Sequence, residues 1–246
     1  MLRVAIPNKG ILSDSAISML REAGYATRRE PSELHLVDEA NNVEFFYLRP
    51  RDIATYVGSG SLDVGITGLD LLLDSGSIAE EVADLGFGAS TFRFAAEVGS
   101  GFNVPADLSG KRLATAYPRL ISDYLGRNAI DCEVVPLDGA VESAVRLGVA
   151  DAVADVVSTG NTLRKAGLSV FGPEILSSTA RLISAPGKSN ESARLLRPLK
   201  GLFLAREYLL LDSDCPTHLV EKPSPITPGF PSPPISPLAP PHRVAT

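Results

Sequence analysis

The chain alternates short apolar runs with longer stretches in which apolar residues recur at helical spacing. The runs that predict buried strands are residues 2–6, 43–48 and 62–67. Residues 12–23 carry Leu, Ala and Ile three and four positions apart, which predicts a helix capped by Ser13 and ended by Gly24. Strand, loop and helix in this order predict an α/β fold with mostly parallel strands and ligands at the strands' carboxyl ends.

A second series of the same kind begins near residue 100. Its expected strands are residues 112–116, 133–136, 152–157 and 178–182, and its expected helices are residues 119–126, 139–147 and 191–208. Segment 60–66 can be laid over segment 148–154, with glycine first and aspartate fourth in both. This internal echo indicates two similar lobes with a ligand cleft between them.

Composition is that of an ordinary globular protein, with 44% hydrophobic and 21% charged residues. The formal net charge of -6 provides no global basic field, so we expect no nucleic-acid partner. No run reaches the roughly 18 apolar residues of a membrane span, and the N-terminal apolar run is too short for a signal peptide. With two cysteines and no zinc-ligand spacing, we expect a soluble, reduced, cytoplasmic protein.

The strongest local signal is the loop that follows Asp155 at the end of an expected strand. The loop residues are Ser158, Thr159, Gly160, Asn161 and Thr162, and a helical pattern comes next. Loop amides, hydroxyls and a helix N-terminus together form an anion site, and glycine lets the backbone approach the ligand. The segment predicts a site for a sugar 5′-phosphate, with Asp155 accepting hydrogen bonds from ribose. The alternative is an ordinary polar β–α turn with a threonine as helix N-cap.

Lys9, Arg49 and Arg51 each lie in a loop after an expected strand of the first series. Such loops converge at one edge of a parallel sheet, and clustered cations recognise phosphate or pyrophosphate. The alternative is that these three charges are merely solvated.

Two further candidates follow expected strands. Gly68 and Asp70 come after residues 62–67, where Asp70 either caps its own helix or meets a ribose hydroxyl, a base amino group or a metal. Tyr117 stands at the end of another strand, where it either stacks on a base or fills a surface position.

Ser90 closes a glycine-containing segment, residues 85–90, in which the backbone either passes close to a ligand or simply crosses from one lobe to the other. Glu142 lies one turn after Asp138 on an expected helix, where it either faces the cleft or is an exposed first-turn acid. None of the three histidines stands beside a serine or cysteine in a nucleophile pattern. A substitution driven by positioning and electrostatics therefore fits better than a covalent mechanism.

These segments, in this order, resemble the ATP phosphoribosyltransferase family over about residues 1–240. The matching segments are residues 3–10, 48–53, 65–70, 114–118, 137–142 and 155–162. The resemblance implies transfer of phosphoribose from 5-phosphoribosyl 1-pyrophosphate to N1 of ATP, with Mg²⁺ and release of pyrophosphate, as the first step of histidine biosynthesis. It also implies two periplasmic-binding-protein-like (type II) lobes, residues 1–95 with 185–211 as lobe I and residues 96–184 as lobe II.

The resemblance also assigns roles. Ser158 to Thr162 would hold the 5′-phosphate, Asp155 and Glu142 would lie near ribose or its magnesium, Lys9, Arg49 and Arg51 would act catalytically on pyrophosphate or triphosphate, and Gly68, Asp70, Ser90 and Tyr117 would line the nucleotide region.

The C-terminal segment has a different composition, since residues 216–246 hold ten of the chain's 19 prolines. Composition alone favours a disordered tail as much as any other state. Residues 226–238 resemble the entry to the histidine-binding regulatory domain of the family's long form. We therefore expect residues 212–246 to be an incomplete remnant of a ferredoxin-like domain and feedback inhibition by histidine to be lost. The resemblance implies a homodimer, and the incomplete remnant puts the family's hexamer in doubt.

Three alternatives remain open. The chain could be a two-lobed ligand-binding protein without catalysis, which an assay of turnover would separate from an enzyme. It could be a phosphoribosyltransferase of the purine-salvage type, although that type has two adjacent acids before its loop and Asp155 stands alone. It could also be an inactive, truncated member of the ATP phosphoribosyltransferase family.

Overall fold

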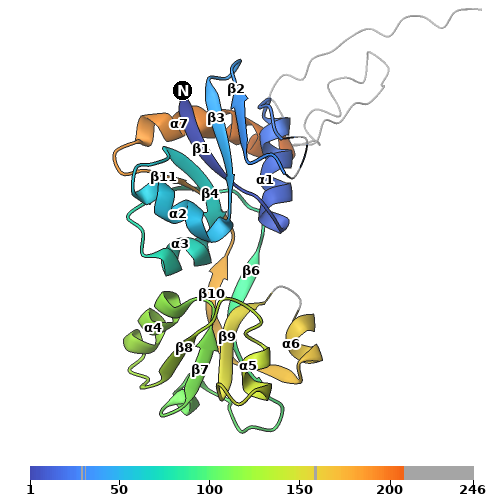
Figure 1. The fold of residues 1–246 in the computed structure, drawn as a ribbon, viewed down its shortest axis with the longest axis vertical. Helices are drawn as coiled ribbons and strands as arrows, with labels where there is room; N and C mark the ends of the chain where they lie inside the picture. The colour runs from blue at the N-terminus through green and yellow to red at the C-terminus, as the bar shows by residue number, and fades with distance from the viewer. Residues whose placement is uncertain (29, 31, 158–159, 208–246) are drawn as a thin grey trace, which may run out of the picture. The chain divides into compact units, whose positions relative to one another are not determined.

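A computed structural model describes residues 1–28, 30, 32–157 and 160–207, so the expected regulatory remnant at residues 212–246 lies outside the described residues. The described part of the chain forms two mixed β-sheets flanked by helices (Figure 1). Within it, every helix is too short or too polar to cross a bilayer.

The first sheet has six strands in the order β2-β3-β1-β4-β11-β5. They are β1 (Leu2–Pro7), β2 (His35–Asp38), β3 (Val43–Leu48), β4 (Val64–Gly68), β5 (Glu80–Asp84) and β11 (Ala180–Ser184). Helices α1 (Ile11–Glu22) and α7 (Ser189–Glu207) share one hydrophobic cluster with this sheet, and α2 (Pro50–Gly58) and α3 (Leu69–Ser75) share another. Val4 lies in the first cluster and Ala5 in the second, because successive residues of a strand point to opposite faces.

The second sheet has five strands in the order β10-β6-β9-β7-β8. They are β6 (Ser90–Glu97), β7 (Arg112–Thr115), β8 (Glu133–Pro136), β9 (Ala152–Val157) and β10 (Leu168–Ser178). Helix α4 (Pro118–Arg127) contributes Leu120, Ile121 and Leu125 to the cluster on one face. Helices α5 (Ser143–Arg146) and α6 (Asn161–Lys165) contribute Ala144 and Leu163 to the cluster on the other.

The expectation of mostly parallel strands is confirmed only for three neighbouring strands of each sheet. Strands β3, β1 and β4 are parallel, as are β8, β7 and β9. The remaining pairs are antiparallel, because β2 folds back on β3 and because β6, β10 and β11 carry the chain between the two sheets. Strands β2, β5, β6 and β10 escape prediction, and the strand expected at residues 178–182 is displaced, since β10 ends at Ser178 and β11 begins at Ala180. Strands β2 and β5 are short edge strands with partly exposed residues and little apolar alternation.

The similarity between segments 60–66 and 148–154 corresponds to a repeated contact between an aspartate and an arginine at the start of equivalent strands. Asp63 precedes β4, and its carboxylate accepts the backbone N–H of Arg3 in β1 at 2.9 Å. Asp151 precedes β9, and its carboxylate accepts the backbone N–H of Arg112 in β7 at 2.9 Å. The glycine three positions before each aspartate has a positive φ, 75° and 70° respectively, which favours glycine there. The two sheets therefore repeat one local design.

The chain passes between the sheets twice, and one cluster joins the two passages. The Asp84 carboxylate accepts hydrogen bonds from the N–H of Gly86 and the hydroxyl of Thr179, both at 2.8 Å, and forms an ion pair with Arg181. All of β6 pairs within the second sheet and all of β11 within the first. The chain thus passes from the first sheet to the second before Ser90 and returns to the first sheet after Ser178. Both crossings come earlier than the boundaries at residues 95 and 185 expected from the sequence.

Candidate active site

The candidate site lies where β3, β4, β7 and β9 end and the following loops or helices begin. Arg51 stands in the first turn of α2, Asp70 in the first turn of α3, and Tyr117 directly before α4. The Asp70 carboxylate lies close enough to the Tyr117 hydroxyl to raise the pKa of that hydroxyl. The guanidinium carbon of Arg51 lies 4.9 Å from the centre of the Tyr117 ring, a cation–π geometry. Asp155, in β9, is close enough to interact electrostatically with all three.

Asp70 is buried, and Ser178 at the end of β10 fixes its orientation. The Ser178 hydroxyl donates to Asp70 Oδ1 at 2.7 Å and accepts the Asp70 N–H at 3.1 Å. Gly68 makes room for this arrangement, since a Cβ there would overlap Asp70 Oδ1. Sequence reasoning missed Ser178, because 108 residues separate it from Asp70. Ser90 pairs with Ser178 across β6 and β10, so the predicted Ser90 lies at the same strand end.

The acidic side of the site is poorly compensated by cations. Burial raises the pKa of Asp155, and the negative charges of Glu142 and Asp70 raise it further. A hydrogen bond from the Val156 N–H, at 2.7 Å, and the charge of Arg51 act in the opposite direction. Burial also raises the pKa of Tyr117, and the Asp70 charge adds to the effect, so Tyr117 stays a neutral hydrogen-bond donor. Such a cluster favours a ligand that brings hydroxyl donors or a cation.

Lys9 and Arg49 lie in neighbouring loops, because β1 and β3 pair in parallel and Asn8 donates its N–H to the Leu48 carbonyl at 2.8 Å. Both side chains are exposed, and neither forms an ion pair with any residue in the described part of the chain. The Asn8 side-chain oxygen is buried and has no hydrogen-bond partner among the described residues. Buried polar groups of this kind normally bind a ligand or water, so Asn8 joins the candidate residues.

Several local predictions are wrong at helix starts. Arg51 does not lie in a loop but inside α2, whose N-cap is Arg49. Ser13 does not cap α1, since Gly10 is the N-cap and Ser13 is buried within the helix. The expected helix at residues 139–147 shrinks to α5, which starts after Glu142 and leaves Asp138 outside it. The cause is backbone with positive φ at residues 139 and 140, 152° and 50°.

The predicted phosphate loop is only partly described. Ser158 and Thr159 lie outside the described residues. Gly160 is the N-cap of α6 with φ 69°, so the alternative of a threonine at the N-cap is wrong. Asn161 and Thr162 are exposed in its first turn.

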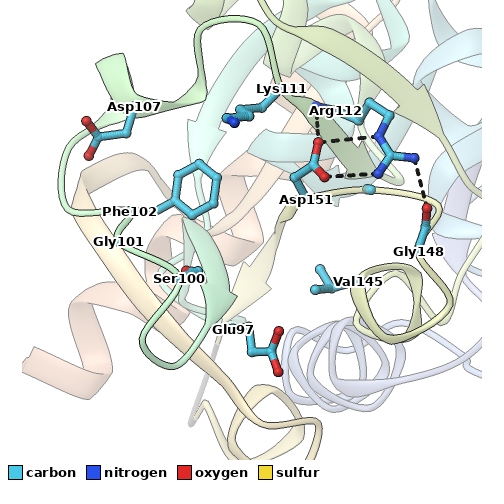
Figure 2. Close-up of a pocket in the computed structure, with 11 residues that line it drawn as sticks. Glu97, Ser100, Gly101, Phe102, Asp107, Lys111, Arg112, Val145, Gly148 and Asp151 are labelled. Atoms are coloured by element: carbon cyan, nitrogen blue, oxygen red, sulfur yellow. Dashed lines mark hydrogen bonds and ion pairs between the residues drawn. The ribbon is translucent and has the colours of Figure 1, made fainter.

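A cavity of about 540 Å³ lies elsewhere in the molecule. Figure 2 shows its lining residues, among them Arg112 at the start of β7, and none of the predicted site residues lines it. Its Arg112 guanidinium donates to the Asp151 carboxylate at 2.9 and 3.3 Å and to the Gly148 carbonyl at 2.8 Å. The charges of Arg112 and Asp151, at the edge of this cavity, are therefore paired with each other within the protein.

Two mixed sheets with a polar cluster at the strand ends define a protein of the periplasmic-binding-protein-like fold. A periplasmic binding protein of an ABC transporter from Brucella ovis has this fold, with a TM-score of 0.53 at 18% identity over 85% of this chain and 69% of that chain. That similarity concerns the fold alone.

The family follows from three closer comparisons. The model of the HisG family, ATP phosphoribosyltransferase, matches residues 49–201. The ATP phosphoribosyltransferase of Pseudarthrobacter chlorophenolicus is 58% identical over 243 residues, which is 97% of this chain and 85% of that protein. The structure of the ATP phosphoribosyl transferase (HisG:HisZ) complex from Thermotoga maritima has a TM-score of 0.71 at 27% identity and covers 83% of this chain and 100% of that chain. The chain belongs to the ATP phosphoribosyltransferase family.

Proposed function

We propose that this chain transfers the phosphoribosyl group of 5-phosphoribosyl 1-pyrophosphate to N1 of ATP and releases pyrophosphate. The observation that carries the proposal is the 58% identity to an ATP phosphoribosyltransferase over 97% of the chain. The clustering of Arg51, Asp70, Tyr117 and Asp155 supports it, because the four residues lie far apart in the sequence and meet at strand ends.

The cations would bind the phosphates of the two substrates. Lys9 and Arg49 are exposed and without an ion pair to any described residue, so their charges are available to an anion. Arg51 offers a planar guanidinium that suits phosphate oxygens. Gly160, Asn161 and Thr162, at the start of α6, would bind the 5′-phosphate together with Ser158 and Thr159. Polyphosphate and 5′-phosphate would thereby be held at opposite ends of the ribose.

The transfer itself needs charge stabilisation and alignment. The N1 lone pair forms a bond to the anomeric carbon while the bond from that carbon to the pyrophosphate oxygen breaks, and pyrophosphate leaves with the electron pair. Adenine N1 carries no proton, so no base has to remove one. Cationic side chains stabilise the negative charge on the leaving group, and alignment of the two reactants can contribute roughly 7–11 kcal/mol at best.

The carboxylates would interact with the ribose. Asp155 is partly buried with a raised pKa, which suits a group that accepts hydrogen bonds from ribose hydroxyls. Tyr117 and Asp70, which lie close together, would line the adenine region next to Ser90. In this arrangement Tyr117 orients the base, with the Asp70 carboxylate near its hydroxyl.

The described residues would supply only part of the coordination shell of a Mg²⁺ ion. The described residues contain no group of three or more potential metal ligands. Mg²⁺ usually keeps one or two carboxylates and takes its other ligands from substrate phosphates and water, so a full protein cage is not required. Asp155 or Glu142 would supply that carboxylate, and the ion would neutralise pyrophosphate charge when bound.

The test is an assay of the purified chain for phosphoribosyl-ATP formation from ATP, 5-phosphoribosyl 1-pyrophosphate and Mg²⁺, with and without histidine. Formation of phosphoribosyl-ATP is the expected result. A folded chain that binds the phosphoribosyl donor without turnover would instead support a binding protein.

Lys9→Ala tests the cation assignment within the same assay. Because Lys9 is exposed and touches no described acid, we expect turnover to fall at least about tenfold while the melting temperature stays within about 1 °C. Lys165→Ala, an exposed lysine at the end of α6, is the matched control and is expected to keep full turnover. Full activity of Lys9→Ala would remove Lys9 from the site.

A further inference from the structure

Asp74 lies on α3, one helical turn after Asp70, and makes three contacts that sequence reasoning did not foresee. Its side chain is only 7% exposed. One carboxylate oxygen accepts the backbone N–H groups of Arg119 and Leu120 at 3.0 and 3.2 Å. The other accepts Arg51 Nη1 at 2.9 Å. A single buried carboxylate therefore joins α2, α3 and the start of α4.

The contact with α4 replaces a missing cap. The N-cap residue of α4, Tyr117, makes no side-chain cap hydrogen bond. The first N–H groups of a helix have no partner within the helix, and a negative charge beside them is stabilising. Asp74 supplies both the acceptor and the charge, and so fixes where α4 begins and where Tyr117 stands.

The contact with Asp74 orients Arg51, which is one of the proposed phosphate-binding residues. Residues four apart on a helix share one face, so Asp70 and Asp74 act on the same neighbourhood. The Asp70 carboxylate lies near the Tyr117 hydroxyl, and Asp74 holds the guanidinium that lies over the Tyr117 ring. The Arg51 side chain remains 46% exposed, so the rest of its planar group can still reach an anion.

We propose that Asp74 is a positioning residue that presents Arg51 to the polyphosphate of a substrate, and this inference rests on the function proposed above. Without Asp74 the long Arg51 side chain gains rotamer freedom, which must be lost again each time the anion binds. Asp74 acts through Arg51 and touches no reacting atom.

Asp74→Asn separates the two contacts. An asparagine oxygen still accepts the two N–H groups of α4, whereas the neutral amide no longer holds the Arg51 charge. Asp74→Ala removes both contacts. Asp123→Asn, an exposed aspartate on α4, is the matched control. For each variant, kcat and the KM of both substrates are measured, together with the melting temperature.

The decisive measurement is a double-mutant cycle between Asp74→Asn and Arg51→Ala. We expect Asp74→Asn to raise the KM of one polyphosphate substrate about tenfold with a melting temperature within about 2 °C of the parent, and Asp74→Ala to lower that temperature further. In the Arg51→Ala background Asp74→Asn should have no further effect. If Arg51→Ala turns over too slowly for kinetics, the same cycle is built from affinities. Calorimetry then measures the affinity of each variant for ATP and for the phosphoribosyl donor.

Two results would overturn the proposal. Parent-like kinetics of Asp74→Asn would show that the ion pair is dispensable, and an equal loss with and without Arg51 would show that Asp74 acts by another route. Absence of turnover in the parent chain would overturn the proposed function itself, which distinguishes the two failures.

Discussion

Ser178→Ala tests whether the buried hydroxyl holds Asp70 in place. Ser178 is 3% exposed, and its hydroxyl makes two hydrogen bonds, one to the Asp70 carboxylate and one from the Asp70 N–H. Alanine fits the same space, so the substitution removes these bonds with little change in packing. The Asp70 N–H belongs to the first turn of α3 and has no helical partner to replace the lost one.

The magnitude follows from the two bonds. A hydrogen bond to a charged group contributes about 1.5–3 kcal/mol and a neutral one about 1 kcal/mol. We therefore expect a loss of about 3 kcal/mol in the free energy of unfolding. For a chain of this size that corresponds to roughly 6–12 °C in melting temperature.

The measurement is urea unfolding with the slope m compared between variants, followed by kinetics on the folded protein. Ser122→Ala is the control, because its hydroxyl donates to the Pro118 carbonyl at 2.7 Å on the exposed side of α4. That variant should lose no more than about 0.5 kcal/mol. A loss below about 1 kcal/mol for Ser178→Ala, at unchanged m, would refute the reasoning.

Three other perturbations follow from the same contacts. Gly68→Ala should turn the Asp70 carboxylate away, because the new Cβ would overlap Oδ1, and lower turnover about tenfold or more; parent-like turnover would contradict this. Hydrogen bonds from Arg112 lower the pKa of Asp151, so this stabilisation is present above the unfolded-state value of about 3.9 and lost as pH falls through the folded-state value. Asp151→Asn should therefore make the melting temperature less sensitive to acid below about pH 5, and an unchanged acid profile would count against it. Burial raises the pKa of Asp155, so stability falls as pH rises through about 3.9, and Asp155→Asn should melt higher at pH 7 while turnover drops; a lower melting temperature would contradict this.

Local sequence patterns were sufficient for much of the fold. Strands β3, β8 and β9 have the bounds predicted from their apolar runs, because such a run is a local signal that needs nothing from distant parts of the chain. The glycine and aspartate echo predicted a repeat, and the structure shows the same Arg–Asp contact at both places. The motifs were also sufficient to predict the family, because the residues that carry the chemistry stand in short loops at the ends of strands.

Tertiary structure alone decided how the site residues are held. Asp70 depends on Ser178, which lies 108 residues away, and α4 depends on Asp74, which precedes it by 45 residues. No periodicity encodes such contacts, since they arise only when β10 returns along β6 and when α3 comes to lie against α4. The sequence therefore determined which side chains stand at the ends of strands. The packing of distant elements determined which of them are buried, hydrogen-bonded and oriented, because burial and hydrogen bonding depend on whatever the fold brings alongside.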